Sequence, residues 1–288
     1  MRNTRIHRAL AAEGGHIVFP GCFDCLSAKL VQRAGFPMSF ISGYSVAATA
    51  LGEPDMGLLT QTEIVDQARR VCGSVGIPIL VDADTGYGNP LNVVRTVKLM
   101  IAAGAAGCFL EDQVWPKRCG HMRNKRVIER TEYIEKIRAA VEARGDADFF
   151  IVARTDSLAA ISMSEALTRV QLAREAGADA SFVEAPESLE HLRTIGRESP
   201  HPNVANMIEH GKTPVLSKAE LAALGFHIIL YPLAGLFAAA KAMETVFRKL
   251  RTDANTAGLS EQMMNFATFN DLIGVEEKYR LAERFGVA

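Results

Sequence analysis

Acidic side chains close two successive apolar runs of the sequence. The run PILVDAD ends in Asp82 and Asp84, and the run GCFLED carries Glu111 near its end. Residues two apart on a strand face the same side of a sheet, so Asp82 and Asp84 would stand together. Neighbouring carboxylates repel each other unless a cation or a proton lies between them. The spacing therefore predicts a hard divalent cation, Mg²⁺ or Mn²⁺, at Asp82, Asp84 and Glu111.

For any one of these acids, the alternative is a helix cap or a pair with a lysine. Three acids at strand ends favour the metal, and the sequence has no HxH or HxxxH pattern that would suggest zinc. Other apolar runs also end in polar residues, namely Arg154, Glu184 and Asn206. An α/β barrel builds its active site at the carboxyl ends of its strands, which makes all of these residues candidates.

A long polar segment, WPKRCGHMRNK over residues 115–125, follows the run that carries Glu111. Long loops over a barrel mouth are often mobile lids. Cys119 lies within two residues of Lys117 and His121, and cationic neighbours lower the pKa of a thiol and activate it. We expect Cys119 to act in the site as a proton donor or a nucleophile. The alternative is an incidental cysteine in a surface loop.

Apolar runs of strand length alternate with amphipathic stretches of helix length, which is typical of repeated βα units. Eight strands are expected, over residues 16–20, 39–43, 78–84, 107–112, 149–156, 180–185, 203–207 and 227–232. The first helix is expected to end near residue 34, and a short helix is expected after the sixth strand. The other helices are expected at about 62–75, 91–103, 130–144, 164–176, 217–225 and 234–250.

Eight such units predict an α/β fold of the (β/α)8 TIM-barrel type. An open doubly wound sheet would usually carry a phosphate-binding glycine turn, and the sequence has no GxGxxG. We expect one domain over residues 1–288. Its C-terminal extension, about 234–288, is expected to be helical, and the apolar residues there need a partner surface.

The bulk composition excludes several classes of protein. A hydrophobic fraction of 48% with 23% charged residues fits a soluble globular enzyme, and a net charge of −1 gives no basic field for nucleic acid or an anionic membrane. The longest apolar stretch, about 226–243, is broken by charged residues, proline and glycine, and the N-terminus lacks an apolar signal core. The cytoplasm is therefore the expected compartment. The five cysteines include a CxxC at Cys22 and Cys25, which we interpret as ordinary thiols.

The motifs SGYS, DADTGYG, ED, KRCGHM, ARTD, VEA and ANMIE occur in this order. Together they resemble the isocitrate lyase and phosphoenolpyruvate mutase superfamily over about residues 19–285, and KRCGHM is typical of its lyase branch. For the metal, the resemblance implies that Asp82 binds Mg²⁺ directly. It also implies that Asp55, Asp84 and Glu111 hold water molecules bound to the metal.

The resemblance also assigns the remaining groups. Cys119 is the catalytic acid on a mobile loop, and Tyr44 is a candidate for the base. The other expected catalytic residues are Arg154, Lys117, His121 and Glu184. The groups that contact substrate are Ser42, the backbone amides of Gly43 and Tyr44, Asp82, Arg154, Glu184 and Asn206. The family further implies a homotetramer, a dimer of dimers that exchange the last barrel helix.

The implied reaction is Mg²⁺-dependent cleavage of a carbon–carbon bond in a 2-hydroxy dicarboxylate. Methylisocitrate lyases carry an arginine where this chain has Met122, and SGG where it has SGY from Ser42 to Tyr44. Tyr44 and ANMIEHG instead resemble the petal death protein and related 2-alkylmalate lyases, such as 2,3-dimethylmalate lyase, which favours a substituted malate as substrate. The alternatives are a methylisocitrate lyase, a carboxyphosphonoenolpyruvate phosphonomutase, an oxaloacetate hydrolase or decarboxylase, and a non-catalytic scaffold.

Overall fold

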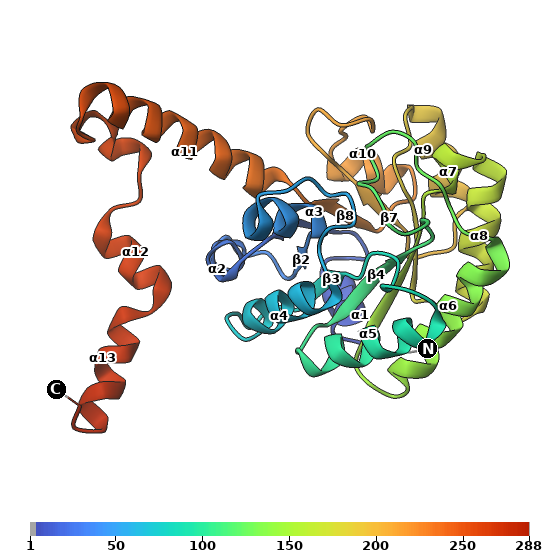
Figure 1. Cartoon of the computed structure of the whole chain (residues 1–288), viewed down its shortest axis with the longest axis horizontal. Helices are drawn as coiled ribbons and strands as arrows, with labels where there is room; N and C mark the ends of the chain where they lie inside the picture. Colours follow the sequence, from blue (N-terminus) through green and yellow to red (C-terminus); the bar gives the residue numbers. More distant parts are fainter. Residues whose placement is uncertain (1–3, 288) are drawn as a thin grey trace.

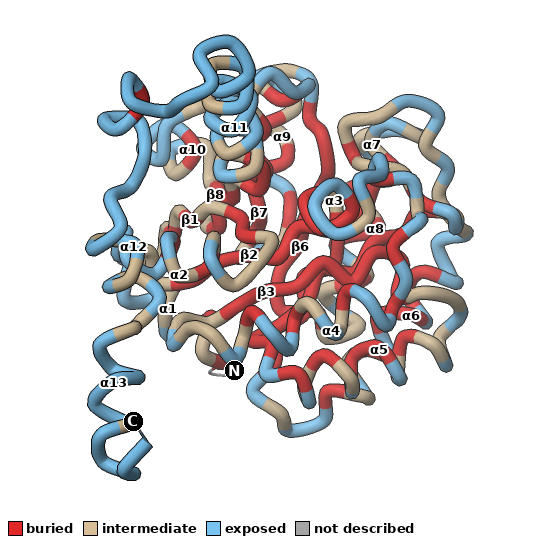
Figure 2. Tube along the Cα trace, turned by 60° about the vertical axis from the view of Figure 1, so that its left-hand side comes forward, coloured by how far each residue is buried: buried red, intermediate tan, exposed pale blue. Residues whose placement is uncertain are grey.

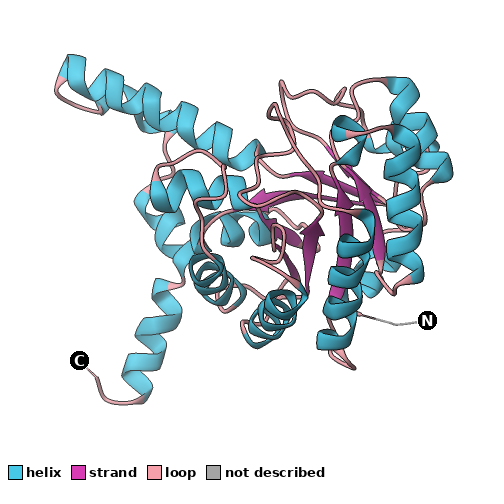
Figure 3. Cartoon of the chain, turned by 45° about the vertical axis from the view of Figure 1, so that its right-hand side comes forward, coloured by secondary structure: helices cyan, strands magenta, loops and turns pink. Residues whose placement is uncertain are grey.

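The structure is a computed structural model that describes residues 4–287. Each of the eight apolar runs forms a strand in it, and neighbouring strands pair in parallel. The strand order is β6-β5-β4-β3-β2-β1-β8-β7. Its two ends meet through a parallel bridge between Ser181 and Asn203, which brings β6 to β7. The strands lie at the centre with helices around them (Figure 3). The strands are β1 (Ile17–Cys22), β2 (Ser39–Ile41), β3 (Ile79–Asp82), β4 (Gly107–Glu111), β5 (Phe150–Thr155), β6 (Ala180–Val183), β7 (Val204–Asn206) and β8 (Ile228–Tyr231).

Helices follow the strands and surround the sheet (Figure 1). Local signals begin them: the Asn89 side chain accepts hydrogen bonds from Leu91 N and Asn92 N, and Pro90 takes the first helical position. The predicted (β/α)8 barrel is confirmed. The helices are α2 (Cys25–Arg33), α3 (Gly43–Val46) continued by the π-helix η1 (Ala47–Leu51), α4 (Gln61–Cys72), α5 (Pro90–Ala102), α6 (Arg130–Arg144), α7 (Ser157–Ala160), α8 (Met163–Glu175), α9 (Leu189–Glu198), α10 (Lys218–Ala223) and α11 (Ala234–Asp253).

The barrel interior is filled by alternate residues of the strands, because successive side chains of a strand point to opposite faces. Phe19, Phe40, Leu80, Phe109 and Phe182 belong to one buried cluster inside the barrel. A separate apolar layer packs between the strands and the outer helices. The interior is therefore a packed core that can support a site at its carboxyl end.

An amino-terminal helix that the sequence analysis did not predict, α1 (Arg5–Ala12), packs against this inner cluster. Ile6 and Leu10 are buried there beside Ile17 and Met38. The helix is short, and its N-cap Thr4 side chain accepts a hydrogen bond from His7 N. Its two buried residues, four apart, are too few to stand out as a period in the sequence.

The C-terminal helices lie outside the barrel. α11 leads away from it, followed by η2 (Ala257–Gln262), α12 (Phe266–Ile273) and α13 (Val275–Arg284) (Figure 1). None of the residues of α11, α12 or α13, all of which the structure describes, is buried (Figure 2). Their exposed apolar residues include Phe247, Phe266 and Tyr279. No helix within residues 4–287 is long and apolar enough to cross a bilayer.

Three imidazoles meet where β1, β7 and β8 begin. The His16 and His227 rings stack with centroids 5.3 Å apart, and the His201 and His227 centroids are 4.7 Å apart. Burial, then His201 and His16, hold the pKa of His227 below 6.5. A lowered folded-state pKa means that the unfolded chain binds more protons as the pH falls through 6.5, so this cluster costs stability in acid.

Replacing His227 with Gln should therefore reduce the acid sensitivity of the fold. We expect the free energy of unfolding to fall less between about pH 7 and about pH 5 in His227→Gln than in the wild type, measured by chemical denaturation. His191→Gln, in helix α9, is the control. Equal losses of stability in wild type and His227→Gln would contradict the account of this cluster.

Candidate active site

Inward-facing positions change from apolar to polar at the mouth of the barrel. In β3 the inward residues run from Leu80 to Asp82, and in β4 from Phe109 to Glu111. The strand register then sets Glu111 beside Arg154 of β5. The same two-residue step past a core residue yields the polar positions Ser42, Arg154, Glu184 and Asn206.

An aromatic layer lies directly beneath these polar groups. The Phe40 and Phe109 ring centroids are 4.6 Å apart, and those of Phe109 and Phe182 are 5.7 Å apart. The guanidinium carbon of Arg154 lies 5.6 Å from the Phe182 ring centroid. Aromatic rings offer the carboxylates little polar compensation, so charges above this layer interact more strongly than they would in water.

A cavity of about 40 Å³ opens above the aromatic layer. Most of the predicted site residues line it: Ser42, Tyr44, Asp55, Asp82, Cys119, Arg154, Glu184 and Asn206. The predicted residues Gly43, Asp84, Glu111, Lys117 and His121 each contact one of these lining residues. The fold therefore gathers the acids, the arginine and the cysteine at one place.

Asp82 and Asp84 come together through a turn. β3 ends at Asp82, and Asp84 has φ of 46°, so the prediction that both acids sit on one strand is wrong. Asp82 accepts hydrogen bonds from Gly43 N and Asp84 N, each over 3.2 Å. A Cβ atom on residue 43 would lie 3.0 Å from Asp82 Oδ2 and 3.4 Å from Asp84 Oδ1. Glycine at 43 thus lets the backbone approach both carboxylates.

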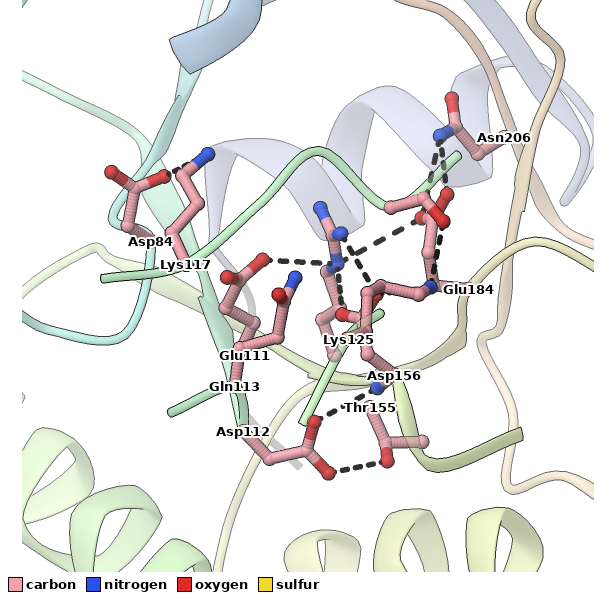
Figure 4. Close-up of polar contacts among 12 residues, drawn as sticks. Asp84, Glu111, Asp112, Gln113, Lys117, Lys125, Thr155, Asp156, Glu184 and Asn206 are labelled. Atoms are coloured by element: carbon pink, nitrogen blue, oxygen red, sulfur yellow. Dashed lines mark hydrogen bonds and ion pairs between the residues drawn. The ribbon is translucent and has the colours of Figure 1, made fainter. Parts of the chain in front are cut away.

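Lys117 of the long loop balances part of this negative charge. Its Nζ lies 2.6 Å from Asp55 Oδ1. It also lies 2.7 Å from Asp84 Oδ1 (Figure 4). Burial opposes the charged form of Lys117, but the carboxylates, first Asp84 and Asp55, hold its pKa well above the ordinary value. Burial raises the pKa of Asp84 to about 7. Lys117 lowers this pKa, and the acidic neighbours of Asp84 raise it again in part. One ammonium is thus shared by two acids.

Arg154 is shared in the same way. Its Nε lies 2.9 Å from Asp156 Oδ2, 3.3 Å from Glu111 Oε2 and 3.8 Å from Glu184 Oε2 (Figure 4). Burial raises the pKa of Glu111 well above its usual range, against the opposing effect of Arg154. Neither Glu111 oxygen accepts a hydrogen bond from residues 4–287.

Buried carboxylate oxygens without donors fit a bound cation. The oxygens of Asp55, Asp82, Asp84 and Glu111 are hard ligands of the kind that Mg²⁺ and Mn²⁺ prefer. Within residues 4–287, however, no three His, Cys, Asp or Glu side chains are arranged to hold a metal ion by themselves. A cation at Asp82 would therefore complete its shell with water or substrate oxygens, as Mg²⁺ commonly does.

Glu184 joins the strands to the long loop. Asn206 Nδ2 donates to both Glu184 oxygens, over 3.3 and 3.4 Å. His121 Nε2 lies 3.2 Å from Glu184 Oε1. A Cβ atom on Gly120 would lie 2.4 Å from Glu184 Cγ, so the loop backbone rests directly on this side chain. Burial opposes ionisation of Glu184, but Arg154 and His121 lower its pKa.

The loop is closed over the mouth, so Cys119 lies at the cavity. Cys119 N donates to Asp55 O over 3.1 Å, and Lys125 Nζ contacts Gly120 O and Asp156 Oδ1 over 2.6 and 2.7 Å. The loop has the closed arrangement because its cations pair with carboxylates at the barrel mouth.

The predicted low pKa of Cys119 is wrong. Burial raises the pKa of the thiol to about 12, and Asp55 and Glu184 add to this shift. Lys117 lowers the pKa less, because its charge is held by Asp55 and Asp84, and His121 faces Glu184. Cys119 therefore carries its proton at neutral pH, which suits an acid and excludes a resting thiolate.

Ser42 and Tyr44 flank the start of α3. Ser42 caps the helix through Ser45 N, and Gly43 N is engaged by Asp82. Burial raises the pKa of Tyr44, and Cys119 and Asp55 raise it further. The Tyr44 phenol therefore rests protonated, which weakens its predicted role as a base.

Two residues of this site were missed by sequence reasoning. Tyr87 donates to Asp84 Oδ2 over 3.2 Å, and its ring centroid lies 5.6 Å from that of Trp115 in the loop. Lys125 ties the loop to Asp156, as described above. The DADTGYG motif contains Tyr87, and Lys125 ends the WPKRCGHMRNK segment. Their positions in these motifs were the available signals.

Comparisons with known proteins agree with the earlier resemblance. The phosphoenolpyruvate phosphomutase family model matches residues 7–251. A chloroplastic carboxyvinyl-carboxyphosphonate phosphorylmutase of Arabidopsis thaliana is 50% identical over 98% of this chain and 84% of that protein. The petal death protein of Dianthus caryophyllus is 46% identical over 99% of this chain and 89% of that protein.

A solved structure gives the same result. The crystal structure of 2,3-dimethylmalate lyase, a PEP mutase/isocitrate lyase superfamily member, has a TM-score of 0.91 and 36% identity, and covers 99% of this chain and 97% of that one. The likeness in sequence and fold extends through almost the whole chain, polar barrel mouth included. The protein therefore belongs to the phosphoenolpyruvate mutase and isocitrate lyase superfamily of lyases and mutases.

Proposed function

We propose that this protein is a divalent-metal-dependent carbon–carbon lyase that cleaves a 2-hydroxy dicarboxylate of the substituted malate type. The products are a 2-oxo acid and a carboxylic acid. The observation that carries the proposal is that Cys119, Asp82 and Arg154 line the same closed cavity. A site of this kind can polarise a hydroxy acid at one end and protonate a carbanion at the other.

Different residues of the cavity would bind the substrate and the cation. Arg154 and the Ser42–Tyr44 backbone would hold the 2-hydroxy carboxylate, with Glu184 and Asn206 on the neighbouring strands orienting it. Asp82, supported by Asp55, Asp84 and Glu111, would hold Mg²⁺ or Mn²⁺. When bound, the cation supplies Lewis acidity that favours ionisation of the substrate hydroxyl.

The bond changes balance without an oxidant or reductant. A base takes the hydroxyl proton, the oxygen lone pair forms the ketone, and the adjacent C–C bond breaks. Its electron pair goes to the carbon next to the second carboxylate, and the Cys119 S–H proton is transferred to that carbon. The thiolate then regains a proton. The high pKa of Cys119 keeps the proton on sulfur until the carbanion, a far stronger base than the thiolate, is formed.

The apolar residues of the cavity support a substituted malate. Ile208, Leu230, Pro232 and Leu233 are among the residues that line it. An alkyl substituent would bury apolar surface there, whereas a third carboxylate would lose its hydration without a cation to replace it. The second candidate is a phosphonomutase that forms a P–C bond, which is favoured by the 50% identity to a protein with that name.

The exposed C-terminal helices support a homotetramer of helix-swapped dimers. An apolar groove of about 540 Å³ lies between α2 and α11. Leu26, Leu30, Phe36, Leu236 and Met243 line it. A second copy of α11 to α13, whose apolar residues are unburied here, would fill the groove and bury those residues.

Cys119→Ser tests the acid. A serine hydroxyl is a much weaker acid than a thiol, so we expect kcat to fall by about 10²- to 10⁴-fold. The assay offers 2-alkylmalates, methylisocitrate and oxaloacetate with detection of the 2-oxo acid, and offers a phosphonate followed by ³¹P NMR. Cys25→Ser, outside the cavity, is the control.

Full activity of Cys119→Ser would contradict the proposed role of the thiol as the proton donor. Phosphonate turnover without release of a 2-oxo acid would favour the phosphonomutase and contradict the lyase.

Asp82→Asn tests the cation site. Loss of the one carboxylate that lines the cavity from β3 should abolish Mn²⁺ binding in isothermal calorimetry, while the fold stays intact by circular dichroism. Asp66→Asn, on the exposed face of α4, is the matched control. Unchanged Mn²⁺ affinity in Asp82→Asn would place the cation elsewhere.

Phe247→Arg tests the helix exchange. Phe247 is 62% exposed on α11, and an arginine there would be buried without a partner in the proposed assembly. We expect sedimentation velocity to show a tetramer for the wild type and smaller species for Phe247→Arg. Thr252→Arg, on the same helix, should leave the tetramer intact. A monomeric wild type would contradict the proposed assembly.

A further inference from the structure

We infer that the loop after β7, residues 207–217, is a second lid, and that His121 is the positioning residue through which this lid fixes Cys119. For brevity, residues 113–129 are called the β4 loop and residues 207–217 the β7 loop. The inference rests on the proposed function, because it assigns a role in placing the catalytic acid.

The first support is the hydrogen bonding of the His121 ring. Lys212 N lies 2.9 Å from His121 Nδ1 and donates to it. A ring nitrogen that accepts a hydrogen bond carries no proton, so the neutral ring has its proton on Nε2. Nε2 faces Glu184, with Oε1 3.2 Å away. His121 therefore touches the backbone of the β7 loop on one side and a cavity residue on the other.

The second support is steric. A Cβ atom on Gly211 would lie 2.7 Å from His121 Nδ1 and 3.0 Å from His121 Cε1. Gly211 does not adopt a left-handed φ, so glycine is required there by the imidazole and by the 3.0 Å approach to Ile208 O. The two loops are packed as closely as a glycine allows.

The third support is the short link between His121 and the acid. Met122 N donates to Cys119 O over 2.8 Å, which closes a tight turn over residues 119–122. Cys119 and His121 belong to this one turn, so a contact that fixes the imidazole also fixes the thiol. Loss of the β7 loop contact would let the turn shift as a unit.

Two polar side-chain oxygens of the β7 loop, Glu209 Oε2 and Thr213 Oγ1, are buried without a hydrogen-bond partner in the described chain. Lys212 Nζ pairs with Glu187 Oε1 at 2.9 Å, but both side chains are partly exposed, and such pairs contribute little. These side chains therefore add little to the attachment of the loop, so its backbone contact with His121 matters for the closed state.

This arrangement couples recognition of substrate to placement of the acid. Ile208 of the β7 loop lines the cavity, and Asn206 just before it donates to Glu184. A substrate that seats against Ile208 would hold the β7 loop closed, and the closed loop would hold His121 and Cys119. Protonation of the carbanion would then be confined to the filled site.

A double-mutant cycle tests the coupling. The variants are Gly211→Ala, His121→Ala and the double variant, in the full-length protein. Gly211→Ala alone should clash with the imidazole and lower kcat by about 10²-fold, with a smaller change in KM, because a small displacement of a catalytic group is costly. In the double variant the new methyl group occupies space that the ring has left, so kcat should be no lower than in His121→Ala.

Two further variants separate positioning from simple loss of packing. Lys212→Ala keeps the backbone amide that binds His121 and should retain nearly full kcat. His121→Asn offers Oδ1 as an acceptor for that amide and should recover part of the kcat lost in His121→Ala. Equal kcat in His121→Asn and His121→Ala would contradict the amide contact.

Hydrogen exchange gives a readout that does not need activity. In the unliganded protein, Gly211→Ala in the β7 loop should also speed exchange in the β4 loop. His121→Ala in the β4 loop should likewise speed exchange in the β7 loop. Additive effects on kcat, or faster exchange confined to the substituted loop, would overturn the inference. Coupled exchange in a protein without lyase activity would instead overturn the proposed function and leave the lid intact.

Discussion

Four buried carboxyl groups crowd the mouth of the barrel above a layer of aromatic rings. Within the described chain, Lys117 and Arg154 are the cations that contact this group, and each is shared among several acids. Burial raises the pKa of Asp84 and of Glu111, which is the physical sign of negative charge without enough compensation. Such a site is completed by a cation or by protons, and this requirement governs the rest of the structure.

The same imbalance explains the cysteine. Burial and, after it, the acids beside the thiol disfavour a thiolate, so Cys119 keeps the proton that an acid must donate. The loop that carries Cys119 also carries Lys117, and closing the loop brings a proton donor and a compensating charge into the site together. Electrostatic attraction to the carboxylates thus favours the conformation in which the acid faces the cavity.

The sequence predicted the barrel and most of the residues at its mouth because both depend on the two-residue period of a strand. Asp84 departs from that rule, since its left-handed backbone ends the strand and still turns the carboxylate toward Gly43. The pKa of Cys119 was misjudged because cations near it in sequence are paired elsewhere in space, with Lys117 on Asp84 and His121 on Glu184. Tertiary partners of this kind leave no local pattern.

The central claim is that the carboxylates at the barrel mouth hold one divalent cation beside the cavity that Cys119 faces. The most direct measurement is anomalous diffraction at the manganese edge from crystals grown with Mn²⁺. The account predicts a single strong peak beside the Asp82 carboxylate, inside the cavity lined by Arg154 and Cys119. No peak at saturating Mn²⁺, or a peak away from Asp82, would contradict it.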